Sequence, residues 1–200
     1  MTQYSGMPKP ARARGKIAPV KLGHVAIRTK QLDAMLDYYG KLLEAEVAFR
    51  NESMGFITYD EEHHRLAIIQ MPDLQPPPEK STGLDHISFS FTTLGELLDT
   101  YKRLEALGIM PFWTIIHGPS TSMYYKDPDG NRVELMIDNF DSAEEIQAFF
   151  ATGAYEENPM GIIFDPEEMI AKHKAGVPFK DIVKRPKLPE GMSWWDMLRT

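Results

Sequence analysis

Histidines and one carboxylate are the residues of this chain whose types and spacing could hold a metal. His24 lies in the apolar run Gly-His-Val-Ala-Ile, and His86 lies in a similar run, Leu-Asp-His-Ile-Ser-Phe. Glu134 lies in a third apolar run, Arg-Val-Glu-Leu-Met, where an unpaired carboxylate would be costly to bury. Two histidines and one carboxylate form the facial ligand set that leaves coordination positions open on non-haem Fe(II). These three residues therefore predict a metal site for oxygen chemistry.

Three further side chains are candidates for proton transfer in such a site: His64, His117 and Tyr124. A positioned imidazole can take a hydroxyl proton from a substrate and return it at a later step. A single histidine in an apolar strand is more often a core or surface residue. The matching settings of His24 and His86 favour metal binding instead.

The composition and charge exclude several classes of function. The chain has 200 residues, which is enough for one well-cored domain with tails. It has no cysteine, so any metal must be held by histidine and carboxylate. The net charge of −7 argues against a nucleic-acid partner, because nucleic-acid binding needs a basic surface. No apolar run approaches the roughly 20 residues that span a bilayer, so we expect a cytoplasmic protein with no membrane partner.

The order of the predicted elements repeats along the chain. The first copy is predicted to contain a strand, a helix and three strands, at residues 22–29, 32–43, 45–49, 55–59 and 66–71. After the Pro-rich stretch 72–78, the second copy is predicted to contain the same elements, at residues 84–91, 94–107, 112–116, 122–125 and 132–137. His24 and His86 take the same position in the two copies. A period of about 60 residues with a shared element order indicates a duplicated βαβββ module.

The parts of the chain outside the repeat differ from it. Residues 1–20 have little periodicity and are expected to form a flexible arm. Residues 21–140 are expected to form one α+β domain whose modules, 22–71 and 83–138, make a cleft around the metal. Residues 141–200 are expected to form a helical tail that packs on the sheet or on another subunit.

A longer motif in the second copy is specific enough to indicate a family. His117 is followed by Tyr124, by the turn from Asp127 to Gly130 and by Glu134. This pattern resembles the signature of the type I extradiol ring-cleavage dioxygenases of the vicinal oxygen chelate superfamily, which are built from paired βαβββ modules. The resemblance runs from about residue 22 to residue 138, and the chain is most similar to the small one-domain branch. It implies ring cleavage of a catecholic substrate by O₂ at an Fe(II) site, which Mn(II) can also fill.

The family's residue roles carry over to matching positions in this chain. The resemblance implies three metal ligands: His24, His86 and Glu134. It also implies three residues that line the active site and act in catalysis: His64, His117 and Tyr124. His64 is the second histidine of a His-His pair that the family carries before the last strand of the first module.

The chain departs from the larger family members in two ways. After His117 they often carry an Asn-Asp pair, whereas this chain has Gly118, Pro119 and Ser120, which changes the pocket shape and hence the substrate. They also have two such domains, and this chain has one. Because its sheet edges and apolar faces then need other cover, we expect a homo-oligomer, with the tail as an association surface or a lid.

Two other functions fit the same superfamily. A glyoxalase-like isomerase or epimerase usually needs a second carboxylate ligand from the last strand of the first module, and residues 66–70 contain no acid. A non-enzymatic binding protein of the bleomycin-resistance type needs no metal triad. The isomerase would leave His64, His117 and Tyr124 without a role, and the metal triad argues against the binding protein.

Overall fold

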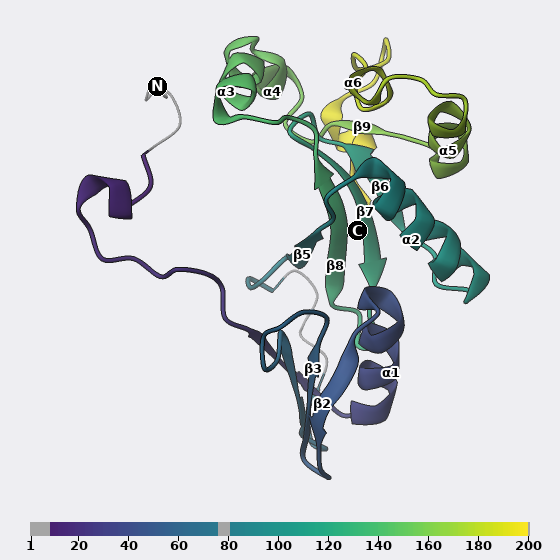
Figure 1. The fold of residues 1–200 in the computed structure, drawn as a ribbon. Coiled ribbons are helices and arrows are strands. Elements are labelled where there is room, and N and C mark those ends of the chain that lie inside the picture. Colours follow the sequence, from purple (N-terminus) through teal and green to yellow (C-terminus); the bar gives the residue numbers. More distant parts are fainter. Residues whose placement is uncertain (1–8, 76–80, 200) are drawn as a thin grey trace. The chain divides into compact units, whose positions relative to one another are not determined.

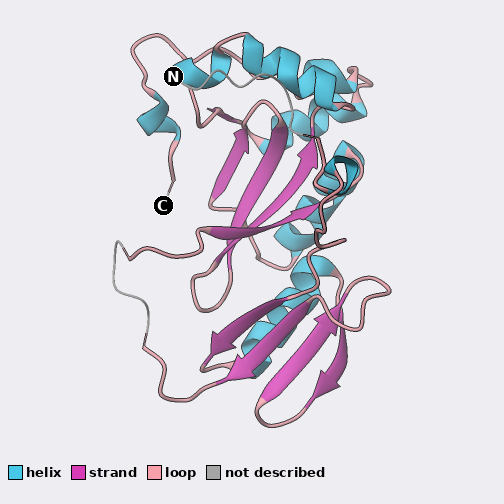
Figure 2. Cartoon of the chain, turned by 90° about the vertical axis from the view of Figure 1, so that its left-hand side faces the viewer, coloured by secondary structure: helices cyan, strands magenta, loops and turns pink. Residues whose placement is uncertain are grey.

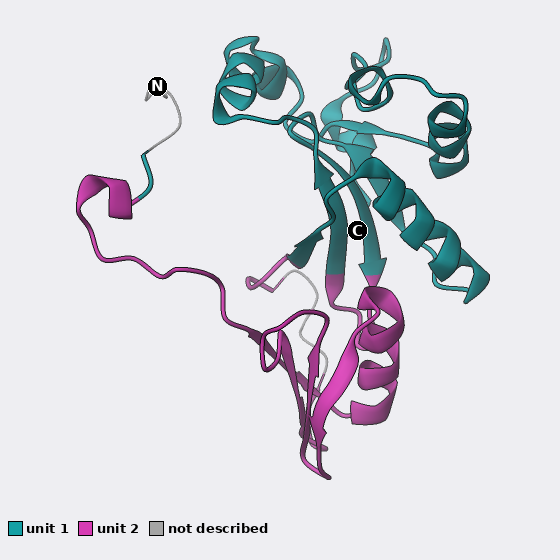
Figure 3. Cartoon of the chain, in the orientation of Figure 1, with its two compact units in different colours: residues 1–10, 87–125, 133–200 teal, residues 11–86, 126–132 magenta. Residues whose placement is uncertain are grey.

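The computed structural model describes residues 9–75 and 81–199. The first eight residues of the predicted arm, and part of the predicted Pro-rich stretch, lie outside the described residues. The chain divides into two compact units (Figure 3). Unit 1 comprises residues 1–10, 87–125 and 133–200, and unit 2 comprises residues 11–86 and 126–132. Each unit is described by itself below.

Unit 2 is built on a four-stranded sheet with one long helix. After a short 3-10 helix at Arg12–Arg14, its elements are β1 (Val25–Thr29), α1 (Leu32–Leu43), β2 (Glu46–Arg50), β3 (Met54–Thr58) and β4 (Leu66–Gln70). The strands lie in the order β1-β4-β3-β2, with β1 parallel to β4 and the other pairs antiparallel (Figure 2). The predicted strand–helix–strand–strand–strand order is therefore confirmed for the first module.

The apolar spacing of α1 explains why it covers one face of this sheet. Met35, Tyr39 and Leu42 are fully buried, and they recur at the helical period of three to four residues. Gly55 of β3 allows the close approach of helix and sheet, because a Cβ at that position would lie 2.7 Å from the Leu36 side chain. The opposite face of the sheet is left for the site residues.

Unit 1 repeats this arrangement and extends it. The repeated elements are β5 (His86–Ser90), α2 (Leu94–Ala106), β6 (Trp113–Ile116), β7 (Ser120–Lys126) and β8 (Arg132–Asp138). They lie in unit 1 except for the terminal residues His86, Lys126 and Arg132, which fall in unit 2. The strand order β5-β8-β7-β6 matches β1-β4-β3-β2 of unit 2, and a two-residue strand, β9 (Ile162–Ile163), is added at the β6 edge (Figure 1). Thr93 and Glu96 form a capping box that starts α2. The α+β fold of two modules is confirmed.

The C-terminal region is helical, as predicted. Its helices are α3 (Ala143–Ala151), α4 (Ala154–Glu157), α5 (Pro166–Lys174) and α6 (Phe179–Ile182), followed by a 3-10 helix at Trp194–Met197. Glu167 of α5 forms an ion pair with Lys102 of α2 at 3.0 Å. Met197 belongs to one buried cluster with Trp113 and Tyr124 of the unit 1 sheet, so the tail folds back on its own unit. Trp195 remains 66% exposed and stacks on Trp194.

The two module histidines are equivalent in the structure. His24 precedes β1 by one residue, whereas His86 is the first residue of β5, and each lies eight residues before its module's helix. The strand predicted at 22–29 begins only at Val25. The carbonyls of Leu22 and Gly23 accept hydrogen bonds from the Arg65 side chain and not from a neighbouring strand. No helix among the described residues is long and apolar enough to cross a membrane.

Candidate active site

Unit 2 gathers two of the predicted site residues on the sheet face opposite α1. The rings of His24 and His64 lie 4.5 Å apart between centroids. The His64 ring also stacks on Phe56 of β3, at 4.4 Å and an interplanar angle of 14°. Phe56 pairs with Ala67 in the sheet, and its neighbours Gly55 and Ile57 point toward α1, so strand alternation places Phe56 on the other face.

The neighbouring His63 forms a hydrogen bond with His64. His63 Nδ1 lies 2.6 Å from His64 Nδ1, so one of these nitrogens carries a proton and the other accepts it. His64 is 9% exposed. Burial, together with the nearby imidazoles of His63 and His24, lowers the pKa of His64 below its ordinary value. A histidine of this kind is neutral at neutral pH and can accept a proton.

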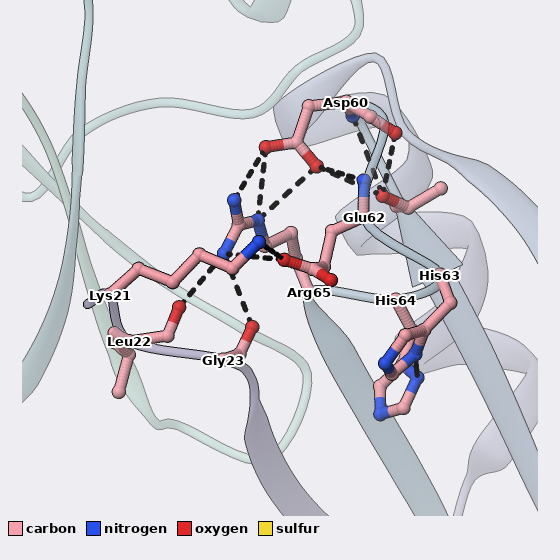
Figure 4. Close-up of polar contacts among 9 residues, drawn as sticks. Lys21, Leu22, Gly23, Asp60, Glu62, His63, His64 and Arg65 are labelled. Carbon is pink, nitrogen blue, oxygen red and sulfur yellow. Dashed lines mark hydrogen bonds and ion pairs between the residues drawn. The ribbon is translucent and has the colours of Figure 1, made fainter. Parts of the chain in front are cut away.

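One arginine joins the His24 segment to the turn that carries the histidine pair (Figure 4). Arg65 follows His64 directly, and its Nη1 donates to the carbonyls of Leu22 at 2.8 Å and Gly23 at 3.2 Å. Its Nε and Nη2 bind the Asp60 carboxylate, at 3.0 and 2.9 Å from Oδ2. The bond to Asp60 holds the guanidinium in place and lowers the pKa of that carboxyl. Arg65 therefore fixes the backbone that leads into His24.

His86 has a carboxylate partner of its own. Its Nδ1 lies 2.7 Å from Asp85 Oδ2, and the other oxygen of Asp85 lies 3.2 Å from Nη1 of Arg132. A carboxylate accepts hydrogen bonds, so the His86 proton sits on Nδ1 and the Nε2 edge becomes the one suited to a metal. Metal-binding histidines nearly always donate their other ring N–H to a carboxylate, a main-chain carbonyl or water, because this bond fixes the tautomer and the ring orientation.

Unit 1 holds a chain of hydrogen bonds among the other three predicted residues. Tyr124 of β7 donates its hydroxyl proton to Glu134 Oε1 of β8 at 2.8 Å. His117 Nε2 lies 3.0 Å from the same hydroxyl oxygen. Glu134 is 6% exposed, so its carboxylate depends on partners of this kind. Trp113 stacks on Tyr124 at 4.7 Å and fixes the plane of the phenol ring.

The number of protons limits how the hydrogen bonds of His117, Tyr124 and Glu134 can be arranged. His117 Nδ1 contacts the carbonyl oxygen of Met160, which can only accept, so Nδ1 carries a proton. The Tyr124 hydroxyl has a single proton. When it goes to Glu134, His117 Nε2 must donate to Tyr124 and the ring is an imidazolium. When His117 is neutral, Tyr124 donates to the ring instead. The two states differ by one proton on His117, and the Tyr124 hydroxyl turns between Glu134 and His117 Nε2 as that proton is gained or lost.

The face on which Glu134 lies also follows from the strands. β5, which begins at His86, is bonded to β8. Ser90 Oγ lies 2.8 Å from Met136 Sδ, so these two side chains share a face of the sheet. Alternation places Glu134 on the Met136 face of β8, so Glu134 lies on the face that carries Ser90 and Met136.

Comparison with known proteins identifies the fold family. The model of the Glyoxalase/Bleomycin resistance protein/Dioxygenase superfamily matches residues 21–135. The chain belongs to this superfamily. A crystal structure of a superfamily domain from Frankia sp. EAN1pec shares the fold, with a TM-score of 0.52 and 19% identity, and covers 64% of this chain and 99% of that one.

Two curated relatives of the chain come from Rhodococcus globerulus. Biphenyl-2,3-diol 1,2-dioxygenase 2 is 43% identical over 162 residues, which cover 80% of this chain and 85% of the relative. Biphenyl-2,3-diol 1,2-dioxygenase 3 is 41% identical over 167 residues, which cover 82% of this chain and 88% of the relative. Both alignments are longer than the superfamily match, which covers residues 21–135.

The donor set fits a divalent transition metal. Neutral imidazoles and a carboxylate are ligands that Fe(II) and Mn(II) accept, and the Asp85 contact prepares His86 for that role. Within the part of the chain that the structure describes, no group of three or more His, Asp or Glu side chains lies together so as to hold a metal. His24 belongs to unit 2 and Glu134 to unit 1, and the complete triad stays a prediction.

Sequence analysis missed several residues that hold the site residues in place. Asp85 could have been found, since an acid directly before a candidate ligand is a local signal. Arg65 is also adjacent to a candidate residue, but nothing local shows that it reaches back to Leu22. Nothing local indicated that the Met160 carbonyl contacts His117, because the two residues lie 43 positions apart.

The buried Tyr124–Glu134 hydrogen bond should contribute measurably to stability. In metal-free protein, Tyr124→Phe should lower the free energy of unfolding by about 1.5–3 kcal/mol, because a buried carboxylate loses a donor. The measurement is urea unfolding. Tyr125→Phe is the matched control: Tyr125 is buried like Tyr124 on the same strand, and its hydroxyl contacts the sulfur of Met123 at 3.8 Å. Equal losses in the two variants would contradict the assignment.

Proposed function

We propose that this chain is an extradiol dioxygenase, which opens the ring of a catecholic substrate with O₂ at a non-haem Fe(II) site. The observation that carries the proposal is the match, at 43% and 41% identity, to two relatives named biphenyl-2,3-diol 1,2-dioxygenases over most of their length. The hydrogen bonds that join His117, Tyr124 and Glu134 support the proposal, because they link two proton-transfer groups to a buried carboxylate.

The proposed metal ligands are His24, His86 and Glu134. Three protein ligands on one face leave positions for two catechol oxygens and O₂, and the bound Fe(II) supplies those positions and the electrons for oxygen activation. Mn(II) accepts the same donors. Two neutral imidazoles and one carboxylate leave the site with net positive charge, which favours a catecholate over a neutral ring.

The remaining residues of the proposed site accept and donate protons. His64, kept neutral by burial, accepts a hydroxyl proton of the substrate. The imidazolium of His117 can give its Nε2 proton to an oxygen of the substrate, and the neutral ring then accepts from the Tyr124 hydroxyl. A proton taken up from solvent restores the imidazolium. Phe56, stacked on His64, holds the imidazole plane fixed during the transfer.

The alternative functions are less well supported. A glyoxalase-like isomerase or epimerase needs a second carboxylate, and β4 carries none. A binding protein of the bleomycin-resistance type has no use for the buried Tyr124–Glu134 contact or for the neutral His64. A cytoplasmic location remains part of the proposal.

Replacement of one ligand tests the metal site. Glu134→Ala should remove most of the bound iron and all ring cleavage, since two imidazoles alone hold Fe(II) weakly. The measurements are metal analysis after loading and formation of the yellow ring-opened product. Asp138→Ala is the matched control, because Asp138 is an exposed acid on the same strand and of the same alternation as Glu134. Full iron occupancy in Glu134→Ala would refute the ligand assignment.

Replacement of the proposed base separates catalysis from metal binding. His64→Phe should keep its iron and lose about 10²–10⁴ in kcat, the usual cost of removing a positioned acid or base. The exposed His173 of α5 provides the control variant, His173→Phe, which should behave as wild type. Iron loss from His64→Phe would show instead that His64 is a ligand.

We also propose that the chain forms a homodimer or a larger homo-oligomer. β2 is an edge strand of its sheet, and it exposes Val47 and Phe49, at 51% and 46%. Exposed apolar side chains on a strand edge are suited to pairing with another copy. Light scattering should give a multiple of the chain mass, and Phe49→Lys should shift that mass downward. A wild-type chain that scatters as a monomer would refute this proposal.

A further inference from the structure

We propose that two residues of the C-terminal region, Asn158 and Arg185, are positioning residues for His117. The inference rests on the proposed function for the role of His117, but its structural part stands on its own contacts. In this proposal the C-terminal region, beyond the two modules, holds the His117 imidazole that faces Tyr124.

The contact that orients the ring comes from the loop after α4. The carbonyl of Met160 accepts the hydrogen bond of His117 Nδ1, which turns the Nε2 edge toward Tyr124. Without that acceptor the ring could rotate about χ2 or take the other tautomer. The position of one main-chain carbonyl therefore decides whether the Nε2 edge of His117 faces the Tyr124 hydroxyl.

Asn158 fixes the loop that presents this carbonyl. It is 2% exposed, and its Oδ1 accepts from the main-chain nitrogens of Met160 at 3.1 Å and Gly161 at 2.9 Å. Its Nδ2 donates to the carbonyl of Gly161 at 2.8 Å. Three bonds from one buried amide leave the peptide before Met160 and the one after it with little freedom.

Gly161 brings the loop against the strand that leads to His117. Its φ is +117°, a conformation that L side chains rarely adopt. A Cβ at this position would lie 2.3 Å from the carbonyl oxygen of Ile116 and 2.8 Å from His117 Cα. The loop can approach His117 this closely only because residue 161 is glycine.

Arg185 ties the loop to His117 from the other side. Its Nη1 donates to the carbonyls of His117 at 2.8 Å and Asn158 at 3.0 Å, and its Nη2 donates to the carbonyl of Ala154 at 2.5 Å. The guanidinium carbon lies 5.4 Å from the centre of the Phe149 ring. A planar fork that reaches three carbonyls at once holds them in a fixed relation, which a lysine ammonium cannot reproduce.

The contacts of Arg185 are unusual for a surface arginine. It donates to the main-chain carbonyl of His117 and to that of Asn158, in the loop that presents the Met160 carbonyl. Burial lowers the pKa of Arg185 from its ordinary value. Desolvation of a charged group costs free energy, so a partly buried arginine with this set of acceptors indicates a requirement for exact placement. These contacts together position the backbone around His117.

A spectroscopic experiment on the full-length, metal-free protein tests the positioning directly. With ¹⁵N-labelled histidine, the Nδ1 proton of His117 should give a resolved signal, because its bond to the Met160 carbonyl slows exchange with water. The His117→Asn variant assigns the signal. In Arg185→Lys and in Asn158→Ser the signal should be lost through exchange, while the circular dichroism spectrum stays that of the folded protein.

Kinetics of the iron-loaded protein give a second readout. Arg185→Lys should lower kcat by up to about 10²-fold with unchanged iron content, as expected when a catalytic group is misplaced. In the His117→Asn background the same substitution should have no further effect, because residues that act through one group are not additive. Arg199→Lys is the matched control: Arg199 is also a tail arginine that donates to main-chain carbonyls, but those of Asp196 and Leu198.

Two results would overturn the inference. One is an unchanged His117 signal in both folded variants. The other is a loss of kcat on Arg185→Lys that is as large in the His117→Asn background as in the wild type, which would indicate a purely structural role. If the wild-type protein cleaves no catechol, the proposed function fails, but the spectroscopic test still decides whether Asn158 and Arg185 hold the ring.

Discussion

The hydrogen bond from Tyr124 to the buried carboxylate of Glu134 is the interaction on which the candidate site depends. A carboxylate that is 6% exposed needs a donor or a cation, and the phenol supplies a donor whose own oxygen contacts His117. This single contact places a proposed ligand and two proton-transfer groups on one sheet face. It also makes the charge of Glu134 and the proton position on His117 parts of one system.

Arginines that bind main-chain carbonyls hold the site residues in both units. In unit 2, Arg65 binds the carbonyls before His24 and is anchored on Asp60. In unit 1, Arg185 binds the carbonyl of His117 itself. Because each arginine acts on the backbone, the histidine ring keeps its nitrogens for a metal or a proton. The first module supplies its own arginine, whereas the arginine that acts on the second module comes from the C-terminal region.

The sequence predicted the periodic and local features well. The apolar spacing of α1, the repeat of strand order and the equal distance of His24 and His86 from the following helices are all local signals, and the fold bears them out. Contacts over long separations left no such signal: Arg185 reaches His117 across 68 residues. β9 was missed because two residues are too few to show alternation. The roles of the site residues rest on the family resemblance and stay predictions.

The most direct measurement is anaerobic addition of biphenyl-2,3-diol to the iron-loaded protein, followed by air. The account predicts that the catechol binds the iron without oxygen, and that air then gives stoichiometric O₂ uptake and a yellow ring-opened product. Extradiol cleavage needs the metal, the catechol and the proton-transfer residues to act together. Iron-loaded protein that binds the catechol but takes up no oxygen, or that yields a colourless intradiol product, would contradict the account.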